Sequence, residues 1–112
     1  MSIKLTLLKS GETIISEMKE LVAEKEEQAH AYLLENPHIV KTREKSFLTE
    51  DEKKTGDFGI DVIMIPWIIL SADKKVIIPV DVVTTIVEPI LSVKQMFIDK
   101  SEAFNIKEEE ND

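Results

Sequence analysis

Apolar and polar residues alternate along the first part of the chain. Between Ile3 and Leu8, the positions Ile3, Leu5 and Leu7 alternate with Lys4 and Thr6, and a second alternating segment, TIISEMKELV, begins at Thr13. Strict alternation is typical of a strand that buries one face. The intervening KSGE contains Gly11, which can take the positive φ of a tight turn. The pattern therefore predicts an N-terminal β-hairpin.

The next segment supports two interpretations. Apolar side chains recur near helical spacing from Met18 to Leu33, in a stretch rich in good helix formers. The charged block AEKEEQ interrupts that stripe, however, and equally suits a solvated loop between two strands. The pattern leaves strand and helix open for residues 16–34. In AYLLENPHIV, the residue before Pro37 avoids helical geometry, so we expect a third, bent strand there.

The longest apolar run, VIMIPWIIL, extends from Val62 to Leu70. It lies in the first of two segments rich in Val and Ile, IDVIMIPWIIL and KVIIPVDVVTTIVEP, which the polar SADK connects. Such segments predict two strands in a second hairpin. Pro66 and Pro79 lack a backbone donor, so both strands should be kinked. The polar residues 41–59 predict a long loop.

A helix is expected to close the domain. Pro89 suits the first position of a helix, and Ile90, Val93 and Phe97 then share one face. We expect the helix over about residues 89–104 and a solvated acidic tail over 106–112.

Length and charge restrict the class of protein. A chain of 112 residues suits one domain, here 1–105. It has no cysteine, no pattern of an export signal and no apolar run long enough to span a bilayer, so a cytoplasmic protein without a membrane partner is expected. Its 22 acidic and 14 basic residues give a net charge of -8, which repels phosphate backbones. Any contact with nucleic acid must therefore be local.

Candidate chemistry is sparse. His30 and His38 are the only histidines, and neither has acidic neighbours at a metal-ligand spacing, so no metal site is expected. No nucleophile with a base and no phosphate-binding glycine loop is visible, so we expect neither catalysis nor a cofactor. Lys41, Arg43 and Lys45 alternate and would share one face of a strand. They could hold a phosphate backbone or simply protect a strand edge.

The segments LLKSGETIISEM, YLLENPHIV, MIPWIIL and IVEP, in this order, resemble small Sm-like (LSm/Hfq-like) proteins of the marine cyanophage type. The resemblance covers about residues 3–98. It implies an all-β fold, a strongly bent five-stranded barrel with a C-terminal helix, assembled as a cyclic homo-oligomer of five to seven subunits. For a phage protein, the compartment would be the host-cell cytoplasm.

In Sm-like rings, the fourth strand of one subunit pairs with the fifth strand of its neighbour. This implies a subunit interface at Met64, Ile65, Trp67, Ile68, Ile78 and Val80. Pairing would cover a strand that is apolar on both faces. The alternative is a central strand covered by the C-terminal helix. Trp67 suits a packing anchor whose indole nitrogen is bonded at a rim.

Sm-like proteins typically bind single-stranded RNA at the pore of the ring. Asn36 matches the Asn of their first motif, but the Asp position falls on Tyr32 and the Arg-Gly position falls on Pro79-Val80. Lys74 and Lys75 lie in the turn that approaches RNA in such rings. The resemblance thus implies a non-enzymatic ring that binds RNA through Tyr32, Asn36, Lys74 and Lys75. The alternative is a scaffold or adaptor ring that binds an unknown protein, with Met96 and Phe97 on the helix as contacts.

Overall fold

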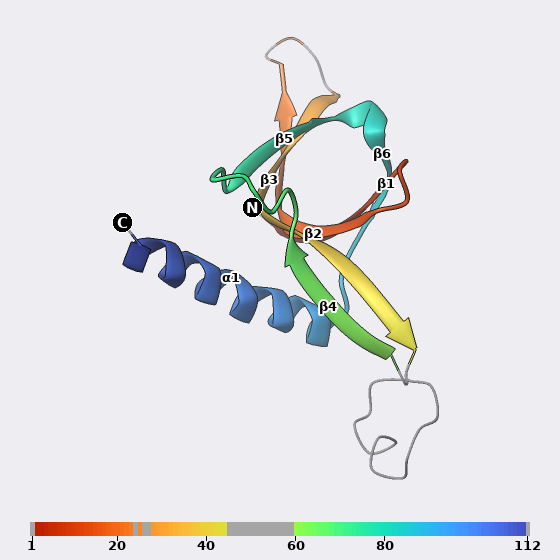
Figure 1. Ribbon diagram of the computed structural model, residues 1–112. Helices are drawn as coiled ribbons and strands as arrows, with labels where there is room; N and C mark the ends of the chain where they lie inside the picture. Colours follow the sequence, from red (N-terminus) through yellow and green to blue (C-terminus); the bar gives the residue numbers. More distant parts are fainter. Residues whose placement is uncertain (1, 24, 26–27, 45–59, 112) are drawn as a thin grey trace.

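The computed structural model describes residues 2–23, 25, 28–44 and 60–111, with side chains described up to residue 103. These residues form a strongly curled antiparallel sheet and one C-terminal helix (Figure 1). The elements, in chain order, are β1 (Ser2–Leu8), β2 (Thr13–Val22), β3 (Ala29–Glu44), β4 (Ile60–Pro66), β5 (Lys75–Pro79), the 3-10 turn η2 (Val80–Val82), β6 (Val83–Val87) and α1 (Leu91–Asn111). The expectation of a β-rich fold with a closing helix is confirmed.

The first hairpin is as expected. Its second strand continues into residues 16–34, for which the sequence had left strand and helix open. Gly11 has a φ of 96° and donates its N–H to the carbonyl of Leu8 at 2.9 Å, which closes the turn. β2 then remains extended to Val22 and pairs with β3 over nearly its whole length. The helical interpretation of residues 16–34 is therefore wrong. Ladder bonds with two neighbours, β1 and β3, outweigh the helix propensity of this stretch.

β3 is the central strand, and it is bent at Asn36. Asn36 has a φ of 52°, a conformation that asparagine tolerates better than most residues. The β2–β3 register shifts at the same point, so that Asn36 and Pro37 together oppose one residue of β2, as in a β-bulge. The bend divides β3 into two halves. Ala31–Glu35 pair with β5, and His38–Glu44 pair with β4.

The prediction of a second hairpin from the sequence is wrong. β4 and β5 do not pair with each other but lie in succession along the same edge of β3. Pro66 ends β4, and the connection at residues 67–74 leaves the sheet before β5 begins. The expected fifth strand is also divided, because η2 turns the chain between β5 and β6, and β6 pairs with β1. The described residues form six strands in the order β4-β3-β2-β1-β6, with β5 on β3.

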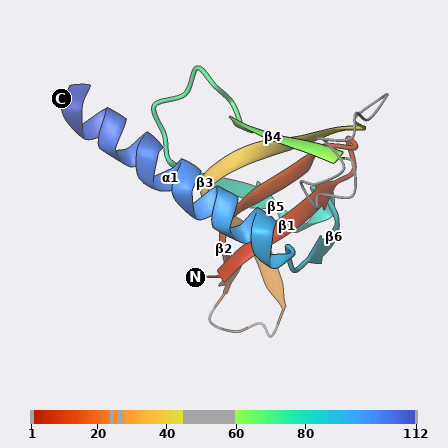
Figure 2. The ribbon, with the colours of Figure 1, turned by 90° about the horizontal axis from the view of Figure 1, so that it is seen from below.

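Each face of the sheet has a small apolar core. One core, on the concave side, contains Leu8, Ile14, Met18, Leu34 and Ile78. The other contains Ile15, Met64 and Phe97, and α1 covers it from outside the sheet (Figure 2). Met64 of the apolar run VIMIPWIIL thus packs beneath the C-terminal helix, as the alternative to a subunit interface expected for this strand.

The boundaries of the C-terminal helix and of the long loop differ from those expected from the sequence. α1 begins at Leu91 rather than Pro89, with the Ile90 carbonyl accepting the first helical bonds, and it continues to Asn111 through the expected tail. Of the loop expected at 41–59, residues 41–44 instead belong to β3, and residues 45–59 lie outside the described residues. Within the part described, no helix is both long and apolar enough to cross a membrane.

Candidate functional site

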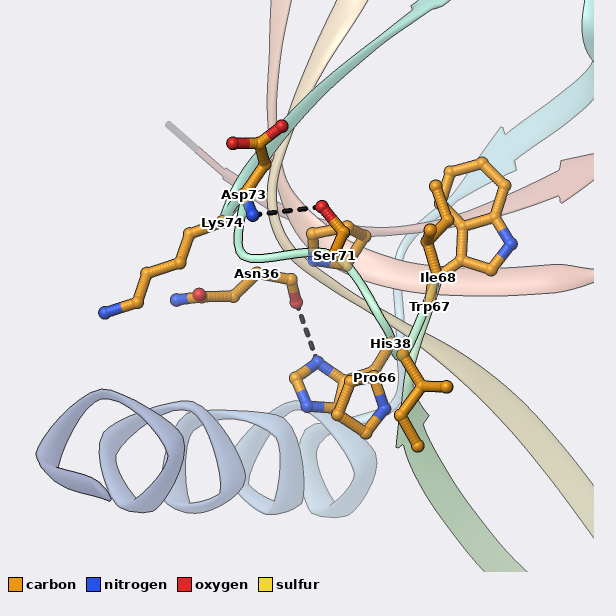
Figure 3. Close-up of a pocket in the computed structure, with 10 residues that line it drawn as sticks. Asn36, His38, Pro66, Trp67, Ile68, Ser71, Asp73 and Lys74 are labelled. Carbon is orange, nitrogen blue, oxygen red and sulfur yellow. Dashed lines mark hydrogen bonds between the residues drawn. The ribbon is translucent and has the colours of Figure 1, made fainter. Parts of the chain in front are cut away.

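The connection at residues 67–74 is attached to the bend of β3 at both of its ends. The N–H of Trp67 donates to the carbonyl of Pro37 at 2.9 Å, and the N–H of Asn36 donates to the carbonyl of Lys74 at 2.7 Å. The second bond extends the antiparallel pairing of β3 with β5, in which Glu35 lies opposite Lys75, by one residue. The bend and the connection thus form one unit (Figure 3).

A small cavity of about 80 Å³ lies between the bend and the connection. Asn36, His38, Trp67, Ser71 and Lys74 are among the residues that line it. An apolar cavity that takes up one benzene molecule has a volume of about 150 Å³, nearly twice as large. A nucleobase therefore cannot enter this cavity, and any base bound here would lie across its mouth.

The side chain of Asn36 is the main polar group of the site. Asn36 is buried, and its Oδ1 accepts no hydrogen bond from the described residues. Its amide and the Lys74 side chain extend toward the same side (Figure 3). An amide beside an ammonium group can bind a polar ligand that offers both a donor and an acceptor.

His38 lies between the bend of β3 and α1 and contacts both. Its ring is buried, its Nδ1–H donates to the carbonyl of Asn36 at 2.8 Å, and its edge meets Phe97 of α1. Burial lowers the pKa of His38, and the Lys100 charge adds to this, whereas the bond to Asn36 partly opposes it. At neutral pH the imidazole is therefore uncharged, and it holds the bend of β3 against the helix.

Three of the four residues expected to bind RNA lie together. Asn36 and Lys74 share a backbone hydrogen bond, and Lys75 pairs with Glu35, the residue before Asn36. Tyr32 lies apart from them. It is opposite Ile78 and packs against the core on the concave side.

The residues expected at a subunit interface fall into three groups. Met64 and Ile78 are buried in the cores of the chain itself. Ile65, Trp67 and Val80 are partly buried. Trp67 is the anchor that the sequence suggested, since its indole Nε1–H donates to Glu12 at 3.3 Å. Ile68 is half exposed.

An apolar tip, formed by Ile68, Ile69 and Leu70, was not expected from the sequence. These side chains are 51%, 68% and 96% exposed. The N–H of Ser71 donates to the carbonyl of Ile68 at 2.9 Å and closes a turn, in which Ile68 has a φ of 55°. This conformation is unfavourable for a β-branched residue. The available signal was Pro66, which forces the strand to end before these three residues.

The expected cationic face is only partly visible. Lys41 and Arg43 are exposed on β3, and Arg43 bonds to Asp61 at 3.3 Å, while Lys45 lies outside the described residues. Among the residues described, no group of three or more His, Asp or Glu side chains is placed to hold a metal ion.

The geometry defines a class of protein: a small, curled antiparallel β-domain with a helix packed on its outer face. No protein-family model matches the chain, and no curated protein matches its sequence.

Proposed function

We propose that this chain is a non-enzymatic, Sm-like subunit that forms a cyclic homo-oligomer and binds single-stranded RNA beside Asn36 and Lys74. The arrangement of strands supports the Sm-like fold. β4 and β5 follow one another along one edge of β3, so they fill a single strand position. The six strands then occupy the five positions of a strongly bent barrel.

The two ends of the sheet support assembly into a ring. In the described part of the chain, β4 pairs only with β3, and β6 pairs only with β1. Both end strands carry exposed apolar side chains, including Ile63 on β4 and Val87 on β6. An apolar strand edge is prone to aggregation unless another strand covers it. Pairing of β4 with β6 of the next copy covers both edges and can close a ring.

The observation that carries RNA binding is the bond between Asn36 and Lys74. It places the buried Asn36 and Lys74 together in the lining of the small cavity, and Lys75 follows Lys74 in the chain. An amide can bond the edge of an unpaired base, and a lysine can contact the adjoining phosphate. Such a local cluster is what a chain with a net charge of -8 needs in order to attract RNA.

Light scattering followed by titration with short uridine-rich and adenosine-rich RNA at low salt tests this function. Asn36→Gly removes the amide but accepts the positive φ, and Lys74→Ala removes the charge. We expect each variant to bind at least tenfold more weakly, whereas Lys9→Ala, which changes an exposed lysine in the first turn, should bind normally. Wild-type protein without RNA affinity at low salt would refute the RNA-binding part.

The proposed pairing of β4 with β6 of the next copy, here called the seam, is tested by Ile65→Asp on β4 and Val87→Asp on β6. A charge at the seam should abolish the ring, because burying an unpaired carboxylate is costly. Met96→Asp on the exposed side of α1 is the control and should preserve the mass of the oligomer. Circular dichroism distinguishes a folded monomer from an unfolded chain. Folded variants with the wild-type ring mass would refute the seam.

A second candidate is an adaptor ring that binds protein instead of RNA. The acidic charge and the exposure of Leu91 and Met96 on α1 favour it. Phe97 cannot contribute as the sequence suggested, because it is buried against the sheet. A ring that ignores RNA, and whose partner capture is lost in Met96→Asp, would support this candidate.

A further inference from the structure

Part of the apolar tip and the amide of Asn36 border the same cavity. Ile68 and Ile69 belong to its lining together with Asn36, whereas Leu70, the third residue of the tip, does not. Ile68 comes from the connection at residues 67–74 and Asn36 from the bend of β3 (Figure 3). The lining thus combines two aliphatic side chains with a buried amide.

We propose that Ile68 and Ile69 form the surface on which the RNA base bonded to Asn36 lies. This inference rests on the proposed binding of single-stranded RNA. The cavity is too small to admit a base, so a base at the Asn36 amide extends over its mouth and meets the other residues of the lining. Aliphatic side chains there cover part of the face of the base and remove apolar surface from water. The base must be unpaired, because the faces of a base in a duplex are already stacked.

The amide of Asn36 determines which kind of ligand can lie over the cavity. Asn36 is 8% exposed, and its Oδ1 accepts no hydrogen bond from the described residues. A purely apolar group that covered the mouth would leave this oxygen without a donor, which is unfavourable. A nucleobase carries N–H groups on its edge and has a flat face that packs on side chains. It therefore satisfies both the amide and the two aliphatic residues.

Such a contact also explains the conformation of Ile68. Its side chain is 51% exposed, and its φ of 55° is unfavourable for a β-branched residue. Without a ligand, glycine would suit this backbone better than isoleucine. Strained residues of this kind cluster at binding sites. The side chain of Ile68 gains its use when a base covers it.

The surface is held in place before RNA binds. The backbone bonds from Trp67 and Asn36 described above fix both ends of the connection to the bend of β3. The N–H of Ser71 donates to the carbonyl of Ile68 and closes the turn between them. Little conformational entropy is therefore lost when a base binds.

Binding through the face of a base should depend only weakly on salt. One or two phosphate contacts reduce the affinity for a single strand by less than about tenfold between about 50 and 200 mM salt, whereas 6–10 contacts reduce affinity by about 10³-fold or more. A chain with a net charge of -8 has little to gain from many phosphate contacts. We therefore expect the smaller loss.

Titration with a short uridine-rich RNA at these two salt concentrations tests the inference. Ile68→Gly and Ile69→Ser should each bind about fivefold more weakly, because less apolar surface is covered. Ile68→Gly accepts the positive φ, so urea unfolding should show a folded protein of similar stability. Leu70→Ser, at a position that is 96% exposed and outside the lining, is the matched control and should bind as wild type. An RNA of the same length without bases should bind at least tenfold more weakly.

The outcomes separate this inference from the proposed function. Wild-type affinity in the double variant Ile68→Gly/Ile69→Ser would overturn the inference. If Asn36→Gly still weakened binding, the RNA site would stand, and the tip would be left to a protein partner. An equal loss in Leu70→Ser, equal affinity for the RNA without bases, or a loss of about 10³-fold at the higher salt would also overturn the inference. Wild-type protein that binds no RNA would refute the RNA site and this surface together.

Discussion

The imidazole of His38 meets the ring of Phe97 edge on, with 5.8 Å between the ring centroids. One residue belongs to the bent strand β3 and the other to α1, so this contact connects the candidate site to the helix. Both side chains are almost completely buried. A change at either residue should therefore affect the docking of α1 and, through the bond from His38 to Asn36, the geometry of the bend.

Acid should weaken the fold through His38. In the unfolded chain its pKa is near 6.5, and in the folded chain it is lower because of burial. The unfolded state therefore binds more protons in this range. The stabilisation is complete above pH 6.5 and is lost as the pH falls through the folded-state pKa. Urea unfolding between about pH 7.5 and 5.5, above the range in which ordinary carboxylates titrate, measures this effect.

His38→Gln should flatten that pH dependence, because it removes the titrating group. His30→Gln, which changes the exposed histidine of β3, should retain the wild-type dependence. An equal pH dependence in His38→Gln and wild-type protein would assign the effect to other groups.

Phe97 should be the residue that attaches α1 to the sheet. It is buried with Ile15 and Met64, so Phe97→Ala should lower the free energy of unfolding by about 3–5 kcal/mol. Met96→Ala changes the preceding, exposed residue and should cost less than about 1 kcal/mol. Chemical denaturation followed by circular dichroism gives both values. Similar losses in the two variants would contradict the assigned orientation of the helix.

Periodicity predicted the local elements better than their pairing. Alternation identified the first hairpin, and Asn36-Pro37 identified the bend. A second hairpin was expected because β4 and β5 are close in sequence. This expectation failed because each of them forms its backbone hydrogen bonds with a different half of β3. Propensity and spacing describe single segments, whereas the division of β3 depends on backbone contacts across the whole sheet.

The candidate site was only partly predictable. Lys74 follows a polar turn, and its position beside Asn36 depends on a long-range bond that no local pattern encodes. The apolar run was expected to be one strand, so the exposure of Leu70 was not foreseen. Pro66 indicated a kink, but only the bond from Trp67 to Pro37 determines where the chain goes afterwards.

The first turn should depend on Gly11. Its φ of 96° is unfavourable for residues with a Cβ, although nothing lies within 4 Å of a Cβ placed there. Gly11→Ala should therefore lower the free energy of unfolding by about 1 kcal/mol or more through backbone strain alone. Gly11→Asn should cost less, because asparagine tolerates positive φ. Thermal and urea unfolding of the two variants measure the difference, and equal losses would contradict this explanation.

The two roles of Asn36, in the bend and in binding, should be separable. Its φ of 52° predicts that Asn36→Ala lowers the free energy of unfolding by about 1–2 kcal/mol, because alanine resists the left-handed conformation. Asn36→Gly should retain most of the stability, because glycine adopts this φ freely and the buried Oδ1, which accepts no bond from the described residues, is removed with the side chain. Urea unfolding ranks the variants. Equal losses of stability in Asn36→Gly and Asn36→Ala would mean that the amide itself holds the bend. In that case, loss of RNA binding in Asn36→Gly would result from distortion of β3 rather than from loss of a contact with RNA.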